Sequence, residues 1–497
     1  MRKIAALLLL LVALNLVYAE NPKREFRGAW IHVIGQSQWM NKSPQQQQQY
    51  IRQQFDLLEE AGCNAVIFQV RPTADALYKS EYEPWSIWLT GKRGKAPAED
   101  WDPLEYAVRE AHKRGMELHA WLNPYRVTSD AKETNPINED YQKHKERYFR
   151  YDNKIFFDPA YQENRDYICM IVKDIVKRYD VDAIHIDDYF YPYPAGTVFD
   201  ADTESYAKFG KGMNKGDWRR ENVNKLIEQI HTTIKSTKPW VRFGVSPFGI
   251  WRNKSTDPRG SNSNGLQNYD ALFADPLYWA EKGWVDYLAP QLYWALDFDK
   301  APSRHLAHWW NDNVNGADIY IGHDTRQTMN TADPKADSGN ELGTKIRLSR
   351  ELDRVKGNIW WHGYWVTENY KGVHNLLKNN YQSTLALAPA YGDPNKRPEP
   401  VKGLKLMKEE GRILLGWDKP LYGKKQSETD AVKFVVYEFL PGENTADLDR
   451  AETIITITPG NCIVLSEDGE GPIKGNSYVV TAIDRMNRES KPSKVKL

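Results

Sequence analysis

The chain has 497 residues, and its 67 basic and 67 acidic residues give a formal net charge of zero. Such a chain lacks the basic surface that nucleic acid or anionic lipid requires, so we expect neither as a partner. Its length allows two or three domains. The 18 Trp and 28 Tyr hint at glycan binding, because aromatic faces stack on sugar rings, although ordinary core packing uses the same residues.

The first 19 residues have the features of a secretory signal peptide. The start is basic, residues 4–16 are apolar apart from Asn15, and Val17-Tyr18-Ala19 fits the small-residue cleavage pattern. A membrane anchor is the alternative, but the run is short for a span and no cysteine follows it to accept a lipid. We therefore expect a mature chain that begins at Glu20, does not span a membrane, and is periplasmic or secreted.

Eight short apolar runs rich in β-branched or aromatic residues predict strands. They are Phe26–Ile34, Cys63–Arg71, Met116–Asn123, Val181–Asp187, Val241–Pro247, Asp286–Tyr293, Ile319–His323 and Gly357–Gly363.

Helical patterns separate these runs. Ser43-Pro44, Asp102-Pro103 and Asp275-Pro276 each combine an N-cap residue with a proline at the first helical position. Eight strands, each followed by a helix, predict an α/β fold, a (β/α)8 TIM barrel over residues 20–390. An open doubly wound sheet is the alternative, but no glycine-rich phosphate loop follows the first strand, where Gly28 stands alone.

The composition changes after the predicted barrel. Residues 391–400 form a Pro-rich linker, and short alternating strands with turn residues follow over 401–497. A length of about one hundred residues suits a small all-β immunoglobulin-like sandwich. The order of Trp417, the VVYEF strand and the YVVTAIDRMNRES segment resembles a fibronectin type III domain. This domain is expected to be a spacer or a module for a protein partner, dispensable for chemistry in a chain that stops near Pro394.

Cys63, Cys169 and Cys462 fit neither a disulfide framework nor a metal spacing, and we expect all three to be buried and unreactive. No HExxH motif or cysteine pair is present, so neither a metal nor another cofactor is expected.

Polar and aromatic residues gather where the predicted strands end, which in a barrel is one common mouth. The candidates for substrate binding are Arg71, Trp121, Asn123, Tyr125, Arg126, His185, Tyr189, Ser246, Gln291, Tyr293, Trp294, His323, Asp324, Trp361 and Trp365.

Asp187 and Asp188 are the candidate catalytic residues. Glycosidic cleavage needs an acid for the leaving oxygen and a second group that stabilises the transition state, and two carboxylates at one mouth can divide these tasks. Repulsion and burial would raise the pKa of one of them. The alternative is structural: neighbours on a strand point to opposite sides, so one Asp would only cap a loop or pair with an Arg.

Six blocks in order, FRGAWIHV, QVRP, LHAWLNPYR, HIDDYFYP, SPFGIWR and APQLYW, resemble the bacterial glycosyl-hydrolase-like family ten. The resemblance spans about residues 24–389. It implies a hydrolase of glycan strands, with peptidoglycan stripped of its peptides as the best-supported substrate of relatives. The family's DD motif falls on Asp187 and Asp188, and its strand-two arginine falls on Arg71. No recognisable cell-wall-binding repeat accompanies the barrel.

Several assignments stay open at this level. Arg71 is either a ligand for a carboxylate or half of an ion pair that orders the second loop. The functional alternatives are a hydrolase of another polysaccharide used for nutrition and a non-catalytic glycan-binding barrel, which the intact Asp pair argues against. By analogy with hexosaminidases, one Asp would hold the substrate's acetamide, the other would act as acid and base, and Tyr293 would bond the acetamide oxygen. Asp324 is the competing nucleophile.

Overall fold

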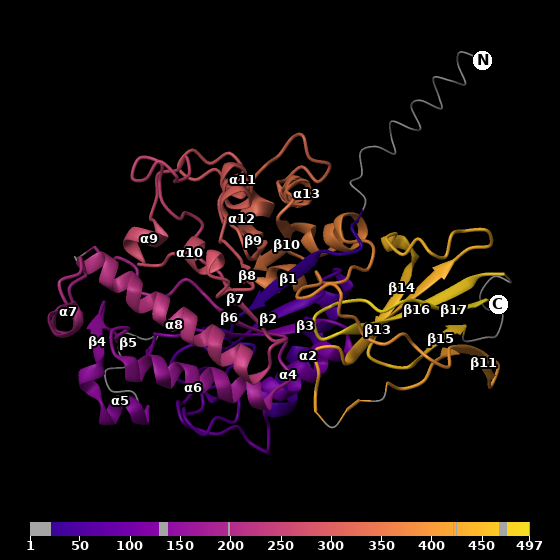
Figure 1. Cartoon of the computed structure of the whole chain (residues 1–497), viewed down its shortest axis with the longest axis horizontal. Coiled ribbons are helices and arrows are strands. Elements are labelled where there is room, and N and C mark those ends of the chain that lie inside the picture. Colours follow the sequence, from indigo (N-terminus) through magenta and orange to yellow (C-terminus); the bar gives the residue numbers. More distant parts are fainter. Residues whose placement is uncertain are drawn as a thin grey trace, which may run out of the picture.

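The computed structural model describes residues 21–128, 138–196, 199–420, 422–423, 425–466 and 475–496. The expected signal peptide lies outside these residues. A barrel ringed by helices forms the larger part, and an all-β part at the C-terminus lies against one end of it (Figure 1). Across the described ranges, no helix is both long enough and apolar enough to cross a membrane.

Eight parallel strands form the closed barrel, in the order β1-β10-β9-β8-β7-β6-β3-β2. They are β1 (Phe26–Ile31), β2 (Ala65–Arg71), β3 (Glu117–Leu122), β6 (Ala183–Ile186), β7 (Arg242–Val245), β8 (Tyr287–Leu288), β9 (Asp318–Asp324) and β10 (Val355–Trp361). Each predicted run overlaps one of them. The first strand pairs with the last, Phe26 opposite Gly357, and this closure excludes the open doubly wound sheet.

Helices surround the barrel, and the N-cap signals mark where several of them begin. Ser43 caps α2 through a capping box with Gln46, and Asp102 caps α4 with its carboxylate. The helices are α2 (Pro44–Glu60), α3 (Ile87–Thr90), α4 (Pro103–Lys113), α5 (Glu139–Lys143), α6 (Gln162–Arg178), α7 (Thr203–Phe209), α8 (Lys215–Thr237), α9 (Asn268–Ala271), α10 (Pro276–Glu281), α11 (Ser303–Asn313), α12 (Thr325–Asn330), α13 (Leu342–Glu351), α14 (Gly363–Thr367) and α15 (Val373–Leu376). Short helical turns are η1 (Lys145–Arg147), η2 (Tyr370–Gly372), η3 (Leu377–Tyr381) and η4 (Ala451–Thr453).

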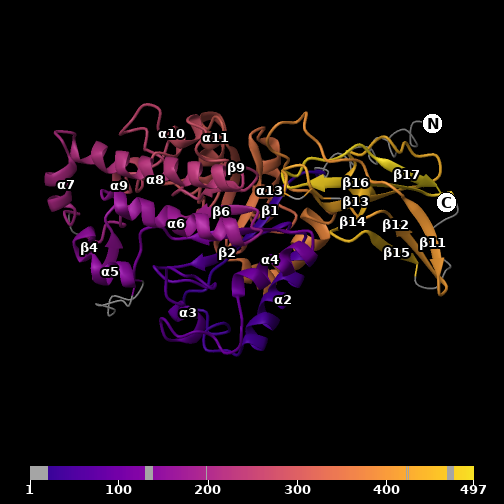
Figure 2. The same ribbon diagram turned by 60° about the horizontal axis from the view of Figure 1, so that its bottom comes forward.

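A hairpin that the sequence patterns did not indicate lies between β3 and α6. Its strands are β4 (Tyr148–Tyr151) and β5 (Lys154–Phe157), and both turn residues, Asp152 and Asn153, have positive φ as tight hairpin turns require. The long helices α6 and α8 lie side by side over this flank of the barrel (Figures 1 and 2).

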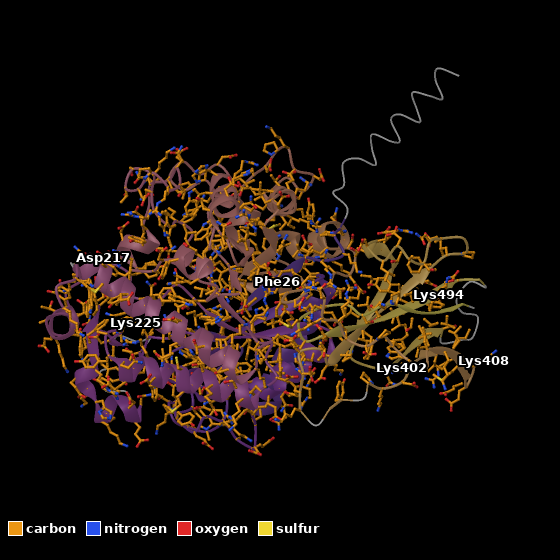
Figure 3. All side chains as sticks on the ribbon, in the orientation of Figure 1. Phe26, Asp217, Lys225, Lys402, Lys408 and Lys494 are labelled. Carbon is orange, nitrogen blue, oxygen red and sulfur yellow. The ribbon has the colours of Figure 1, made fainter. Side chains whose placement is uncertain are left out.

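Large side chains fill the barrel interior. Phe26 lies in the middle of the molecule, whereas Asp217 and Lys225 of α8 lie on its outer side (Figure 3). The ring of Phe26 stacks on Tyr320 with centroids 4.0 Å apart. A Cβ at Gly244 would come within 1.9 Å of the ring of Tyr287, so glycine at this position leaves the space that this ring occupies.

Two antiparallel sheets form the C-terminal part. The first has the order β11-β12-β15 and the second β14-β13-β16-β17. Their strands are β11 (Lys405–Glu409), β12 (Arg412–Gly416), β13 (Ala431–Phe439), β14 (Ile454–Thr458), β15 (Cys462–Ser466), β16 (Ser477–Asp484) and β17 (Ser493–Lys496). Trp417 is buried between the sheets against Phe434. The fibronectin type III type of this fold remains an interpretation.

The C-terminal sheets are docked on the barrel, at the end where its strands begin. Leu387 packs into a buried cluster with Val435 and Val479 of the four-stranded sheet. The hydroxyl of Tyr391 contacts the carbonyl oxygens of Trp240 and Arg485 at 2.6 and 2.8 Å. The expected linker, residues 391–400, therefore begins inside an interface, and the sheets are not a freely tethered module.

The cysteine expectation needs one correction. Cys63 and Cys169 are buried free thiols, but Cys462 is exposed. It opens β15, an outer strand of the three-stranded sheet, where the side chain faces solvent instead of the space between the sheets.

Candidate active site

A pocket of about 400 Å³ opens at the C-terminal ends of the barrel strands, opposite the docked sheets. This is the end where barrels of this type carry their active sites. Its lining comprises Trp30, His32, Ile34, Gln69, Trp121, Arg126, Asp187, Asp188, Tyr189, Tyr193, Ser246, Gln291, Tyr293 and Trp361.

Both members of the Asp pair line this pocket. Strand β6 ends at Ile186, so Asp187 and Asp188 belong to the loop that follows, and the alternation of side chains along a strand no longer separates them. Their exposed fractions are 4% and 3%.

Asp187 is held by fixed N–H donors. The indole Nε1 of Trp121 donates to its Oδ2 at 3.2 Å, and Nδ2 of Asn123 lies 3.2 Å from each of its carboxyl oxygens. Asn123 does not line the pocket, so its role toward the site is to hold Asp187.

Asp188 has a different set of partners. The hydroxyl of Tyr193, a pocket residue of the same loop, donates to its Oδ2. The side chain of Gln291 also bonds to the Asp188 carboxyl, and its Nε2 donates to the Ser246 carbonyl oxygen at 2.9 Å. Gln291 thus bridges the loops that follow β6, β7 and β8.

The two carboxyls have raised pKa values. Burial is the largest cause for both, and it raises the pKa of Asp187 to about 7 and that of Asp188 to about 6. The positive charge of Arg126 opposes this rise, while the charge of Asp188 adds to it at Asp187. Between pH 6 and 7 the pair therefore carries about one proton, the state that acid catalysis by one carboxyl and charge stabilisation by the other requires.

Aromatic rings form the pocket walls. The rings of Trp30 and Trp121 both meet Trp361 edge to face, with centroids 6.4 and 5.9 Å away. On another wall, the guanidinium of Arg126 lies 4.7 Å over the ring of Tyr189 and donates to the carbonyl oxygen of Pro72. Tyr293 completes the lining, and burial together with the nearby charge of Asp188 raises the pKa of its hydroxyl, so it remains a donor.

His185 lies beneath the pocket and is fully buried. Its Nε2 contacts Ser246 Oγ at 3.0 Å, so this histidine orders a lining residue from below. Burial lowers the pKa of His185 well below its usual range, and the ring is neutral.

Several residues predicted to bind substrate are absent from the pocket lining. The guanidinium of Arg71 is fully buried in an ion pair with Glu83, and it also donates to the carbonyl oxygen of Asn123 at 2.5 Å. Of the two interpretations of Arg71, these contacts match the ion pair that orders the second loop and not the ligand for a substrate carboxylate. Tyr125 is buried in the core, and its hydroxyl has no hydrogen-bond partner among the described residues.

The residues after β9 also point elsewhere. His323 is buried, with Nε2 2.8 Å from Asn358 Oδ1. Asp324 is the N-cap of α12, since its Oδ1 accepts the backbone N–H of Gln327 at 2.7 Å. These two side chains are held by β10 and α12 and do not reach the pocket lining.

Two predicted stacking residues lie outside the lining. Trp294 packs edge to face on Phe248, with centroids 5.5 Å apart. Trp365 of α14 contacts Tyr364 and Tyr370 at 4.7 and 5.0 Å, beside the pocket wall that Trp361 forms. Trp361 is the one of the three predicted platforms that lines the pocket.

Five lining residues were not among the predicted ones: Trp30, His32, Ile34, Gln69 and Tyr193. The alternation of side chains along the first predicted strand was a signal for Trp30, His32 and Ile34, which share one face. Gln69 lies two residues before the end of the second strand, on the face opposite Val70. Nothing in the sequence pattern distinguished Tyr193 from the other aromatic residues of its loop.

Over the ranges that the structure describes, no group of three or more His, Cys, Asp or Glu side chains is arranged to hold a metal ion. The chemistry open to this pocket from its own side chains is proton transfer and charge stabilisation by carboxyls, beside aromatic surfaces suited to sugar rings. Glycoside hydrolases are one class of enzyme built on such barrels, and the carboxyl pair and aromatic walls of this pocket fit that class.

Comparison with known proteins leads to the family. Residues 25–337 match the model of the family described as glycosyl hydrolase-like 10, and the chain belongs to this family of glycosidases. It is 38% identical over 488 residues to "Glycosyl hydrolase YngK" of Bacillus subtilis (strain 168), covering 95% of this chain and 93% of the relative. It is 39% identical over 326 residues to "Glycosyl hydrolase DigH" of Escherichia coli (strain K12), covering 61% and 74%.

Solved structures are more distant. The catalytic domain of a β-amylase from Paenibacillus polymyxa aligns with a TM-score of 0.45 at 11% identity, over 73% of this chain and 99% of that one. The PgaB (BpsB) glycoside hydrolase domain from Bordetella bronchiseptica aligns with a TM-score of 0.43 at 12% identity, over 72% and 99%.

Proposed function

We propose that this glycosidase cleaves an N-acetylated glycan, with peptidoglycan glycan strands as its substrate, and that the acetamide group of the substrate takes part in the reaction. The observation that carries the proposal is the lining of the pocket. Among the described residues that form it, Asp187 and Asp188 are the only acidic ones, and they are adjacent in the chain.

Adjacent carboxyls do not suit the other common mechanisms. A retaining enzyme places its nucleophile and its acid on opposite sides of the sugar, about 5 Å apart, and an inverting enzyme leaves a wider gap for water. Such pairs normally come from two strands. Asp324 was the candidate for a second strand, but its carboxylate caps α12. A nucleophile supplied by the substrate itself removes the need for another carboxyl.

The hydrogen bonds suggest how the pair divides its roles. Both oxygens of Asp187 already face N–H donors from Trp121 and Asn123, which favour the carboxylate form. We assign to Asp187 the acetamide N–H of the substrate. This further donor lowers the pKa of Asp187 in the complex, so that the proton shared by the pair moves to Asp188. Asp188 is then the acid.

The reaction follows from these roles. The acetamide oxygen, held by the Tyr293 hydroxyl, attacks the anomeric carbon as the glycosidic bond breaks, and Asp188 gives its proton to the leaving oxygen. The charge of Asp187 stabilises the positively charged cyclic intermediate. Water then adds to the anomeric carbon and gives a proton to Asp188, the acetamide is restored, and the enzyme returns to its starting state.

Aromatic residues support the binding of a long strand. From Trp361 in the pocket wall, rings of His362, Tyr364, Trp365 and Tyr370 follow one another with centroid distances of 4.0, 5.1, 4.7 and 5.0 Å. All are partly exposed. We propose that this row binds sugar units outside the cleavage site, which suits action within a strand.

The proposed substrate fits the proposed location. Residues 1–19 have the pattern of a signal peptide, which would bring the enzyme to the compartment of the cell wall. N-terminal sequencing of the protein secreted or exported by its host should find Glu20 first. An intact N-terminus on the exported protein would contradict cleavage.

The decisive experiment combines substrate and inhibitor. Purified glycan strands, with and without stem peptides, are incubated with the enzyme and the products are analysed by mass spectrometry; hydrolysis of the strands without peptides is expected. A thiazoline that mimics the cyclic intermediate should bind far more tightly than the parent sugar. Cleavage only of glycans that lack acetamide groups, or a trapped covalent glycosyl–aspartate, would overturn the proposal.

A further inference from the structure

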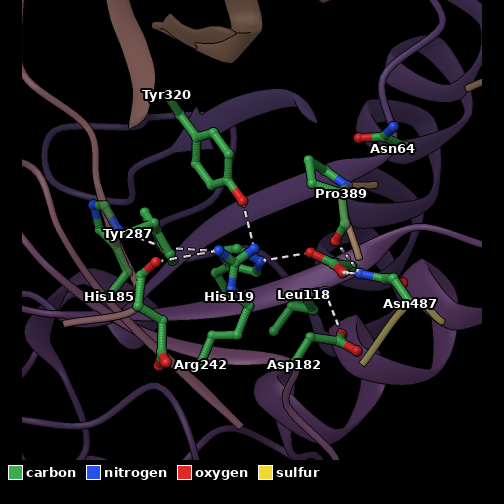
Figure 4. Close-up of polar contacts among 12 residues, drawn as sticks. Asn64, Leu118, His119, Asp182, His185, Arg242, Tyr287, Tyr320, Pro389 and Asn487 are labelled. Carbon is green, nitrogen blue, oxygen red and sulfur yellow. Dashed lines mark hydrogen bonds and ion pairs between the residues drawn. The ribbon is translucent and has the colours of Figure 1, made fainter. Parts of the chain in front are cut away.

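A row of buried polar side chains runs through the barrel from the docked C-terminal sheets to the floor of the pocket. Its members are Asn487, Glu117, His119, Tyr287, His185, Ser246 and Trp30, and each is at most 4% exposed. Figure 4 shows the part of this row nearer the C-terminal sheets, with the two histidines on either side of Tyr287.

The contacts at the pocket end of the row indicate which ring nitrogen of His185 carries the proton. The indole Nε1 of Trp30 can only donate, and it lies 3.2 Å from His185 Nε2. That nitrogen must therefore carry the lone pair. Because burial keeps the ring neutral, its proton is on Nδ1, from which it is donated to the Tyr287 hydroxyl oxygen at 2.9 Å.

The same argument assigns the protons toward the other end of the row, at Glu117. Tyr287 accepts from His185, so its own proton goes to His119 Nδ1 at 2.8 Å. His119 then carries its proton on Nε2 and donates it to Glu117 Oε2 at 2.9 Å. Burial raises the pKa of Glu117, but the hydrogen bond from His119 and the surrounding positive charges, those of Lys433 and Arg242 among them, outweigh burial and lower that pKa, so Glu117 is an anion.

The C-terminal part supplies the last partner. Nδ2 of Asn487, in the turn between β16 and β17, donates to Glu117 Oε1. Asn487 has φ of 57°, a conformation that Asn and Gly tolerate, and its carbonyl oxygen accepts from Arg24 at 2.9 Å. Every donor in the row has an acceptor, whereas reversing one tautomer would leave a buried N–H or O–H unpaired.

We propose that Glu117, His119 and Tyr287 are positioning residues through which the docked C-terminal part holds His185 as the Nδ1–H tautomer. In this form the single lone pair of His185 Nε2 is shared by two donors, the Ser246 hydroxyl at 3.0 Å and the Trp30 indole at 3.2 Å. The Ser246 hydroxyl therefore donates its proton to His185, and only its lone pairs are available to a ligand in the pocket. It recognises a hydroxyl or N–H of the substrate, and it rejects a group that can only accept.

The recognition by Ser246 rests on the proposed function, but the tautomer of His185 does not. The two are therefore tested separately. The protein is labelled with 15N-histidine, and the nitrogen chemical shifts in its NMR spectrum distinguish a protonated from an unprotonated ring nitrogen. The signals that disappear in His185→Gln belong to His185. Wild-type protein should show the proton on Nδ1.

Three variants of the full chain test the row. Tyr287→Phe removes the hydroxyl that joins the histidines, and Asn487→Gly removes the side-chain donor while the backbone conformation remains favourable. Tyr320→Phe is the matched control, since its buried hydroxyl accepts from Arg242 and lies outside the row. Tyr287→Phe should lower kcat/KM about tenfold, as expected for one lost positioning hydrogen bond. Asn487→Gly should act in the same direction, and Tyr320→Phe should retain wild-type kcat/KM.

The outcomes separate the two inferences. A proton on Nε2 of wild-type His185 would overturn the positioning role whatever the activity. So would ring nitrogen signals of His185 that are the same in Tyr287→Phe as in the wild type, because that variant removes the acceptor of the Nδ1 proton. Equal losses in Tyr287→Phe and Tyr320→Phe would do the same, because a general loss of packing would then explain both. A wild-type enzyme without activity on N-acetylated glycans would count against the proposed function alone, and the spectra would still decide the role of the row.

Discussion

Replacing Asp187 by Asn should remove activity and, at alkaline pH, make the protein more stable. Turnover on the true substrate is expected to fall by about two to four orders of magnitude, the usual contribution of a positioned acid or base. Asp188→Asn should lose a comparable amount. The gain in stability arises because Asp187 is a buried carboxyl whose ionisation is unfavourable in the folded state.

The size of this gain follows from the pKa. Burial raises the pKa of Asp187 from its ordinary 3.8 to about 7. Since one pH unit corresponds to about 1.4 kcal/mol, the folded state is destabilised by up to about 4 kcal/mol once the carboxyl is ionised. The amide that replaces the carboxyl in Asp187→Asn is never ionised, so it avoids this destabilisation. It does turn an N–H group toward the donors of Asn123 and Trp121, at a cost of about 1–2 kcal/mol. The net gain is about 2 kcal/mol above pH 7.

The pH dependence has a definite sign. Between pH 4 and 7 the folded wild type holds a proton that the unfolded chain has released, so its stability falls as pH rises through this window. Below pH 4 both states are protonated and the cost vanishes. The variant lacks this dependence, so its advantage should be present at pH 8 and absent, or reversed, at pH 4.

Denaturant unfolding at the two pH values measures the effect, with Asp312→Asn as a control because Asp312 is an exposed residue of α11. The control should change stability little at either pH. A loss of stability in Asp187→Asn that is the same at pH 4 and pH 8 would refute the argument from burial. Full activity in both Asp187→Asn and Asp188→Asn would refute the catalytic assignment.

Three further predictions follow from the site and the docking. The profile of kcat/KM against pH should be a bell with its maximum between about 6 and 7, because below that range both carboxyls hold protons and above it neither does; a plateau up to pH 9 would contradict the shared proton. A chain that stops after Pro394 should bind more of a dye for apolar surface and unfold at a lower temperature than the full chain, since it uncovers Leu387 and leaves Glu117 without Asn487; identical melting would show that the docking adds no stability. Trp365→Ala should lower kcat/KM for long glycan strands about tenfold but leave short fragments unaffected, as loss of one stacking surface predicts, whereas equal losses on both would place its effect inside the cleavage site.

The architecture was readable from the sequence because its signals are local. Each barrel strand is a short apolar run, and N-cap residues such as Ser43 and Asp102 mark where helices begin. Since parallel strands of a barrel end at one mouth, a list of strand ends is also a list of candidate site residues. Asp187, Asp188, Tyr293 and Trp361 follow from this reasoning, and the structure brings all four into one pocket.

The direction of individual side chains was not readable in the same way. Arg71 ends its strand as a binding residue would, yet Glu83, which comes twelve positions later, turns it into a buried ion pair. Asp324 also ends a strand, but the helix that follows takes its carboxylate as a cap. In both cases a partner elsewhere in the chain competes with the pocket, and strand periodicity carries no information about that partner.

By itself, therefore, the sequence determined the class of fold, the family and the end of the barrel at which the chemistry belongs. Only the tertiary structure decided that the C-terminal sheets dock on the opposite end and that Asn487 reaches Glu117 at the base of the barrel. The physical reason is that hydrophobic periodicity acts over a few residues, whereas a buried hydrogen bond joins groups 370 positions apart only after both parts have folded and excluded water.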